Sequence, residues 1–118
     1  MSSDRGQEAA DRARDAAERA AGAGQRVAEL QRRLQCLRGS GKPSGWTPDA
    51  ARAAYERSVV LAAESRRSAI VAFNRAADAH RAAAEAARSP GDRDRELEHL
   101  ELAGADDLSA AALARIGN

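Results

Sequence analysis

The sequence predicts an all-α fold in which two long helices form an antiparallel, coiled-coil-like hairpin followed by one or two short C-terminal helices. Three observations favour it. Of the 118 residues, 31 are alanine and 18 are arginine, both strong helix formers. Apolar residues recur at alternating spacings of four and three over more than four heptads. A single Gly- and Pro-containing segment, residues 39–46, separates the two long periodic stretches.

The first helix is expected over residues 3–38. Ser2 or Ser3 can cap it, and Asp4 lies near the positive end of its dipole. The apolar seam of this helix keeps the four–three spacing without exception. Its members are Ala9, Ala13, Ala16, Ala20, Ala23, Val27, Leu30, Leu34 and Leu37.

The second helix is expected over residues 47–88, after the loop of residues 39–46. Thr47 is a good N-cap, Pro48 suits the first turn, and Asp49 faces the helix dipole. This helix has its own four–three series, which includes one charged residue and one histidine. Its members are Tyr55, Val59, Ala62, Arg66, Ala69, Phe73, Ala76, His80, Ala83 and Ala87.

The two series can be matched in one register, which we state as a hypothesis. Leu34 would face Tyr55, so the bulky residues would lie near the loop and alanines would meet alanines at the far end. Arg66 would face the glycine-containing segment 22–24, where there is room. The remaining pairs are Leu30 with Val59, Val27 with Ala62, Ala23 with Arg66, Ala20 with Ala69, Ala16 with Phe73, Ala13 with Ala76, and Ala9 with His80.

The C-terminal segment is expected to form two short helices, over residues 90–103 and 106–116, separated by Gly104. Ser89 and Asp92 resemble a capping box for the first, and Asp106 or Asp107 can cap the second. Helices this short do not stand alone. We therefore expect them to pack on the hairpin or on a second copy of it.

Length and composition indicate one domain, residues 1–118, in a reducing compartment. The single cysteine, Cys36, excludes an intrachain disulfide. The net charge is +1, but residues 1–88 carry a balance of +5 and residues 89–118 a balance of −4. We find no apolar stretch that would serve as a signal peptide or a membrane span. The expected localisation is cytoplasmic.

Apolar residues outside the seam predict an additional packing partner. Val60, Leu61, Ile70 and Val71 lie off the series, and two helices cannot cover them. The C-terminal helices or a second subunit could do so, and we expect a homodimer, with another helical protein as a further partner. The candidate interaction surface comprises Leu30, Leu34, Leu37, Trp46, Tyr55, Val59, Val60, Leu61, Ile70 and Val71.

A basic cluster near the loop suggests a different partner. Arg32, Arg33, Arg38 and Lys42, with Trp46 nearby, are candidate contacts to phosphates of a nucleic acid. The competing interpretation is an Arg-rich face exposed to solvent. Neither half of the chain has the charge density of a dedicated nucleic-acid binder.

The sequence contains no complete set of residues for a metal site or a catalytic site. Glu96 and His99 have the Glu-x-x-His spacing of di-iron bundles, but such sites need a second Glu-x-x-His pair. The only other histidine in the sequence is His80, and the residue three positions before it, where the glutamate would stand, is Ala77. The pair is otherwise part of a charged, solvated helix. Cys36 has no neighbouring Lys or His pattern that would activate a thiol. We therefore expect no catalytic residue, no metal and no cofactor.

Two positions in the second series have alternative interpretations. His80 is either a pH-sensitive position or a ring whose edge lies at the end of the bundle. Arg66 is either a buried specificity device or a side chain that reaches solvent past small neighbours.

Two resemblances point in the same direction. The phrase from Arg67 to Glu85 resembles the Ala/Arg/His-rich repeats of small helical proteins of actinobacteria, a group without an assigned activity. Trp46 between two long helices is similar to the arrangement in WxG-type helical hairpins, which pair into four-helix dimers. Here Thr47 and Pro48 follow the tryptophan, and a Tyr-x-x-x-Asp/Glu secretion signal is absent after the second helix.

The sequence therefore predicts a non-enzymatic protein that acts as a protein–protein interaction or scaffold module through the faces of its hairpin. The alternative is a nucleic-acid-associated regulator that uses the Arg-rich face.

Overall fold

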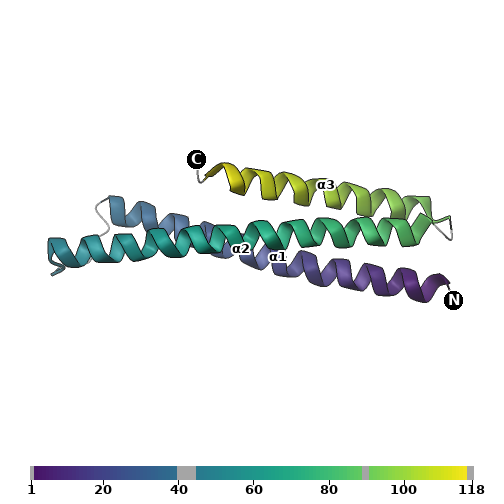
Figure 1. Cartoon of the computed structure of the whole chain (residues 1–118), viewed down its shortest axis with the longest axis horizontal. Coiled ribbons are helices and arrows are strands. Elements are labelled where there is room, and N and C mark those ends of the chain that lie inside the picture. The colour runs from purple at the N-terminus through teal and green to yellow at the C-terminus, as the bar shows by residue number, and fades with distance from the viewer. Residues whose placement is uncertain (1, 40–44, 89–90, 117–118) are drawn as a thin grey trace.

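The computed structural model describes residues 2–39, 45–88 and 91–116, and it confirms that the fold is all-α. Three helices make up the regular structure of these residues: α1 (Ser2–Arg38), α2 (Pro48–Arg88) and α3 (Arg93–Ile116). Figure 1 shows α2 between α1 and α3, running in the direction opposite to both. The molecule is a rod of 65 × 24 × 17 Å. None of the described helices is long and apolar enough to cross a lipid bilayer.

The core between α1 and α2 consists of small residues at heptad spacing. Six of the nine predicted seam positions of α1 are buried, and Ala16, Leu30 and Leu37 are half-buried. Burying an alanine removes little apolar surface, so this contact gains stability from close approach of the helix backbones. Two sets of buried residues seven apart form its centre: Ala13, Ala20, Val27 and Leu34 on α1, and Ala62, Ala69, Ala76 and Ala83 on α2.

The register between α1 and α2 differs from the predicted one by one heptad. Ala13 packs with Ala83, not with Ala76, and Val27 packs with Ala69, not with Ala62. A slip of seven residues keeps every side chain on the same face, so the apolar pattern alone cannot distinguish the two registers.

Phe73 shows why the observed register is preferred. Its ring lies against Gly24, where an added Cβ would be 3.4 Å from Cζ and 3.5 Å from Cε2. In the predicted register the ring would instead meet the side chain of Ala16. The glycine-containing segment therefore makes room for Phe73, and not for Arg66 as predicted. Arg66 is half-buried.

The ends of α2 and α3 are defined by side-chain caps. Thr47 Oγ1 accepts a hydrogen bond of 3.0 Å from the backbone N–H of Ala50, which confirms the predicted cap. At the start of α3, Asp92 Oδ1 accepts a bond of 3.2 Å from the N–H of Arg95, so Asp92 takes the role that the sequence assigned to Ser89. Ser89 itself lies outside the described residues.

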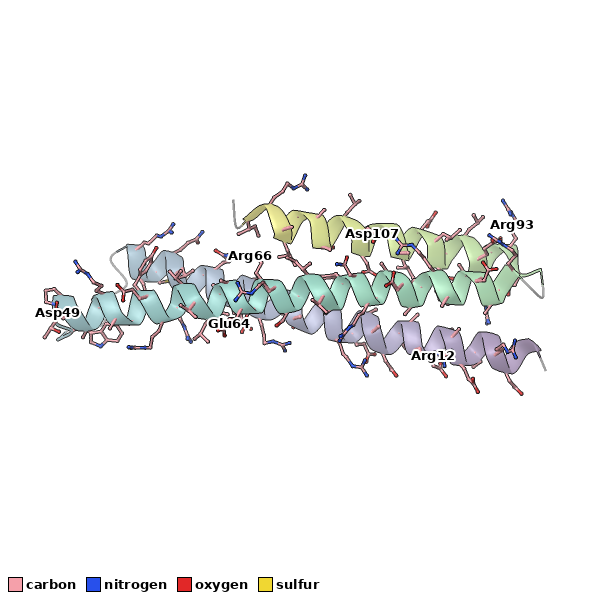
Figure 2. The ribbon with its side chains drawn as sticks, viewed as in Figure 1. Arg12, Asp49, Glu64, Arg66, Arg93 and Asp107 are labelled. Carbon is pink, nitrogen blue, oxygen red and sulfur yellow. The ribbon has the colours of Figure 1, made fainter. Side chains whose placement is uncertain are left out.

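The predicted break at Gly104 is wrong, because α3 is continuous over 24 residues. Ala103 and Ala110 are buried on either side of this glycine, and their packing against α2 offsets a helix-propensity cost of about 1 kcal/mol. Asp106 and Asp107 accordingly lie within the helix and do not cap it. Figure 2 shows Asp107 between α3 and α2, where it pairs with Arg81.

Candidate functional site

The predicted interaction surface divides into three groups by exposure. Leu34 is buried in the hairpin, so its assignment to a surface that contacts a partner was wrong. Four members are half-buried: Leu30, Leu37, Tyr55 and Ile70. Five members are exposed: Trp46, Val59, Val60, Leu61 and Val71.

α3 covers only part of α2, and the members of this surface from Tyr55 to Leu61 lie outside the covered part. Leu113, near the end of α3, packs against the cluster of Ala23, Val27 and Ala69. Residues 48–68 of α2 therefore pack on α1 without a third helix, and Figure 1 shows α3 ending near the middle of α2. We call this part of the molecule, with its partner segment of α1, the two-helix half.

An apolar groove lies on the two-helix half. Leu37, Trp46 and Leu61 line it together with Ala54 and Ser58, and its volume is about 410 Å³. Arg33 and Arg57 also line the groove, as does the exposed thiol of Cys36. Apolar side chains bordered by arginines form a surface suited to an amphipathic, acidic helix.

The basic cluster is only partly available to a nucleic acid. Arg32 and Arg33 are exposed, and Arg38 donates a hydrogen bond of 3.0 Å from Nε to the hydroxyl of Tyr55. The guanidinium carbon of Arg38 also lies 5.8 Å from the centroid of the Tyr55 ring. Lys42 lies outside the described residues.

A second feature, which the sequence did not predict, is a pair of histidines between α2 and α3. His80 Nδ1 and His99 Nδ1 are 3.0 Å apart, so the N–H of one ring donates a hydrogen bond to the unprotonated nitrogen of the other. His80 Nε2 lies 3.8 Å from Asp106 Oδ2, and this oxygen is buried without a hydrogen-bond partner among the described residues. With Asp106 ionised, the favourable arrangement has His99 donating to His80 and His80 Nε2–H directed at the carboxylate.

This cluster can hold one extra proton but not two. One proton can be added if His80 carries it and His99 moves its own proton to Nε2. Charging both rings would place two N–H donors face to face at 3.0 Å. Burial lowers the pKa of His80, and the charge of His99 lowers it further, while Asp106 and Glu98 oppose this change.

The pKa of Asp106 is shifted in the other direction. Burial raises it, the adjacent Asp107 raises it further, and His80 opposes this change. His99 is half-buried and lines grooves of about 480 and 360 Å³. Arg14 of α1 and Arg95 of α3 line the second of these grooves with His80.

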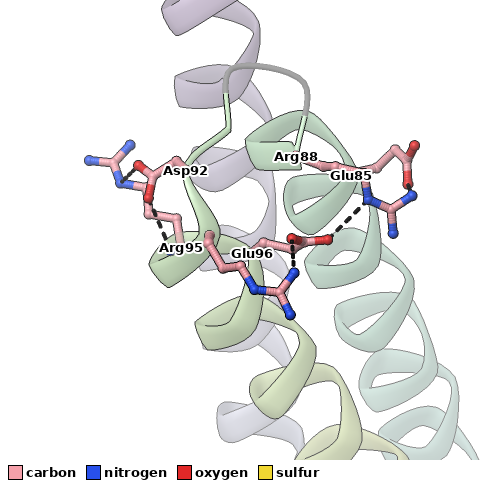
Figure 3. A network of polar contacts seen from close by, with 6 residues as sticks. Glu85, Arg88, Asp92, Arg95 and Glu96 are labelled. Atoms are coloured by element: carbon pink, nitrogen blue, oxygen red, sulfur yellow. Dashed lines mark hydrogen bonds and ion pairs between the residues drawn. The ribbon is translucent and has the colours of Figure 1, made fainter.

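The Glu96–His99 pair does not form a single site. Glu96 is buried, and its Oε2 accepts a hydrogen bond of 3.0 Å from Arg88 Nε, as Figure 3 shows. This bond is the main reason why the pKa of Arg88 is raised. The expectation that Glu96 is solvated was therefore wrong, since it links the end of α2 to the start of α3. In the described ranges, no group of three or more His, Cys, Asp or Glu side chains could hold a metal ion.

The sequence does contain a signal for the histidine cluster. His99 and Asp106 are seven residues apart, and so share a face of α3, and His80 stands in the apolar series of α2. Splitting α3 at Gly104 obscured this spacing. The contact of His80 with α3 also replaces the predicted contact with Ala9 and places its ring between helices, not at the end of the bundle.

Comparisons with known proteins found no match to a family model, to a curated protein or to a solved structure. We therefore infer function from the exposed surface and the side-chain clusters of the described residues.

Proposed function

We propose that this protein is a non-enzymatic protein–protein interaction module that associates through the two-helix half of its antiparallel α1–α2 hairpin. The observation that carries the proposal is the exposure of four large apolar side chains within about four turns of helix and the adjoining loop. Trp46, Val59, Val60 and Leu61 are each between 41 and 55% exposed. Large apolar side chains that are exposed in one part of a molecule are typical of interaction sites.

The shape of the hairpin supports a helical partner. The groove lined by Leu37, Trp46 and Leu61 lies between two helices. A third helix can pack there if the ridges formed by its side chains fit between those of the two helices. The arginines at its border favour a partner with acidic side chains next to its apolar stripe. A second copy of the chain and another helical protein both meet this description.

Photocrosslinking tests this proposal. We would place a photoreactive phenylalanine analogue at Leu61, and in a matched control at Arg12, which is exposed on α1 in the other half of the rod (Figure 2). We expect a discrete adduct at Leu61 in cells of the native host, and loss of that adduct when Val60→Asp is added. Equal labelling at both positions, or no adduct at Leu61, would contradict the proposal.

A nucleic-acid-associated regulator is the alternative function. Arg32 and Arg33 remain available for phosphates, whereas Arg38 is engaged by Tyr55. Retention on DNA or RNA that weakens steeply with salt would support the alternative, and no retention at about 50 mM salt would dismiss it.

A further inference from the structure

The face of α2 that α3 covers continues beyond the end of α3. Val59 and Arg66 precede His80 by 21 and 14 residues, which are whole heptads, so the three residues lie on the same face. His80 is 4% exposed beneath α3, whereas Val59 is 41% exposed. We call this continuation the open lane and define it by five residues, with Arg67 at its edge: Arg52, Glu56, Val59, Ala63 and Arg66.

The outward side of α3 carries a second unpartnered apolar face. Leu97, Leu100 and Leu108 are 44, 45 and 70% exposed. Leu97 and Leu108, eleven residues apart, lie on the side of the helix away from buried Ala103, and Leu100 lies at the edge of this side. Asp94, Glu101 and Arg115, which stand at heptad spacing with Leu108, accompany them. We call this set the outer α3 face.

We propose that the open lane is filled by α3 of a second copy of this chain, so that two copies form an antiparallel dimer. This inference rests on the proposed function and names the partner. Each copy supplies one open lane and one outer α3 face, and a two-fold rotation satisfies both at once, which closes the assembly at two copies.

The lengths agree with this arrangement. The open part of α2, residues 48–68, spans about 32 Å, and the 24 residues of α3 span about 36 Å. The two α3 helices would both end near the middle of α2 and would lie in one layer shared by two hairpins. This alignment sets Val59 level with Leu108 of the second copy, and Arg52 level with Glu101 of the second copy. One heptad further, it also sets Arg66 level with Arg115 of the second copy, a pair of like charge.

The distribution of charge favours a contact between α3 and the open lane over a contact between two α3 helices. In α3 six acidic side chains accompany three basic ones. In residues 26–67 nine basic side chains accompany four acidic ones. Two α3 helices, each with a balance of −3, would therefore repel each other, whereas α3 and the part of the chain over residues 26–67, with a balance of +5, attract.

The expected interface is modest. Two equivalent contacts, each about 30 Å long and one helix wide, bury on the order of 1,200 Å² in total, at the lower end of the range for specific complexes. We therefore expect a dimer that dissociates measurably and that weakens as salt is raised.

Charge exchange tests the pairing. Arg52→Glu would place like charges at both contacts, and Glu101→Arg would do the same from the other side. Within the described part of the chain, neither residue takes part in an ion pair, so both variants should fold. In sedimentation equilibrium of the full chain, we expect each variant alone to dissociate about tenfold more readily than the wild type.

An equimolar mixture of the two variants restores opposite charges at both contacts. We expect it to recover the wild-type dissociation constant, while Arg12→Glu, a control with the same change of charge, leaves that constant unchanged. Leu108→Asp should abolish the dimer, with the circular dichroism spectrum of each variant checking that it folds.

Two results would overturn the inference. One is a wild-type chain that stays monomeric at hundreds of micromolar in low salt. The other is a dimer that neither Arg52→Glu nor Leu108→Asp weakens. In the second case the proposed function stands, since association then uses another face, such as the groove that the crosslinker at Leu61 probes.

Discussion

His80 couples the stability of the molecule to pH. Its pKa is lowered in the folded chain, so between the folded value and the ordinary value of 6.5 the unfolded chain binds more protons. Its contribution to stability is therefore complete above pH 6.5 and is lost as pH falls toward the folded pKa. The raised pKa of Asp106 has the opposite effect on stability. Between its ordinary value of 3.8 and its higher value in the folded chain, the folded chain binds more protons, so stability falls as pH rises.

We accordingly expect the melting temperature to fall between about pH 7.5 and about pH 5.5. Circular dichroism melts of the wild type and of His80→Asn check this. The variant should lose most of this fall, whatever its melting temperature at the higher pH. A wild-type melting temperature that rises on acidification in this window would contradict the role given to the cluster.

Gly22 and Gly24 form a matched pair that tests the observed register. Within 4 Å, an added Cβ at Gly22 meets only Arg26 Nη1, at 3.9 Å, whereas an added Cβ at Gly24 meets the ring of Phe73 at 3.4 Å. Gly22→Leu should therefore gain helix propensity, and Gly24→Leu should displace the ring. Overpacking of this kind costs about 1–3 kcal/mol, and the two variants should differ by that amount in urea denaturation.

The alternative register makes a different prediction for this pair. If α1 and α2 were aligned one heptad away, Phe73 would lie over Ala16, and Gly24→Leu and Gly22→Leu would have similar stabilities. Ala16→Leu would then be the damaging variant.

At the scale of elements, the continuity of α3 predicts the effect of a single substitution. Gly104 is exposed, and an added Cβ would meet nothing within 4 Å. Gly104→Ala should stabilise the chain by about 1 kcal/mol because it improves helix propensity without a clash. Urea denaturation of the monomer measures this. A destabilised Gly104→Ala would indicate that the helix breaks at this position, as the sequence first suggested.

The helices of the hairpin could be predicted because their signals are local. Periodicity identified α1 and α2, and Thr47 marked the start of α2 through a hydrogen bond to a residue three positions away. The length of α3 could not be predicted in this way, since contacts with α2 override the preference of Gly104 to end a helix. The register was equally inaccessible, because two seams of alanine at heptad spacing fit at several offsets.

Some features of the candidate sites could also be predicted from the sequence, and others could not. Exposure of Val60, Leu61 and Val71 follows from their position off the seam, and the structure has all three exposed. The contact between His80 and His99 joins residues 19 apart on two helices, so it depends on how α3 folds back. The prediction placed Leu34 on the interaction surface although its position in the apolar seam already favours burial against α2.

At the scale of the whole molecule, the account requires an extended rod. The radius of gyration of the Cα atoms is 19.3 Å, whereas a compact domain of this length has a value of about 13–14 Å. Small-angle scattering of a dilute sample should give a value close to 19 Å. A value near that of a compact domain would mean that the two-helix half folds back and is not exposed.

In the proposed dimer, two copies associate antiparallel, with each α3 in the open lane of the other copy. Its most direct measurement is the distance between spin labels at Ala50, which is exposed near the start of α2, in an Ala50→Cys chain with Cys36→Ser. The proposed dimer separates these labels by about 50 Å, twice the distance from Ala50 to the middle of α2. Pulsed electron paramagnetic resonance giving that distance would support the claim. A distance below about 30 Å, which would place the two loop ends together, or no intermolecular distance at all, would contradict it.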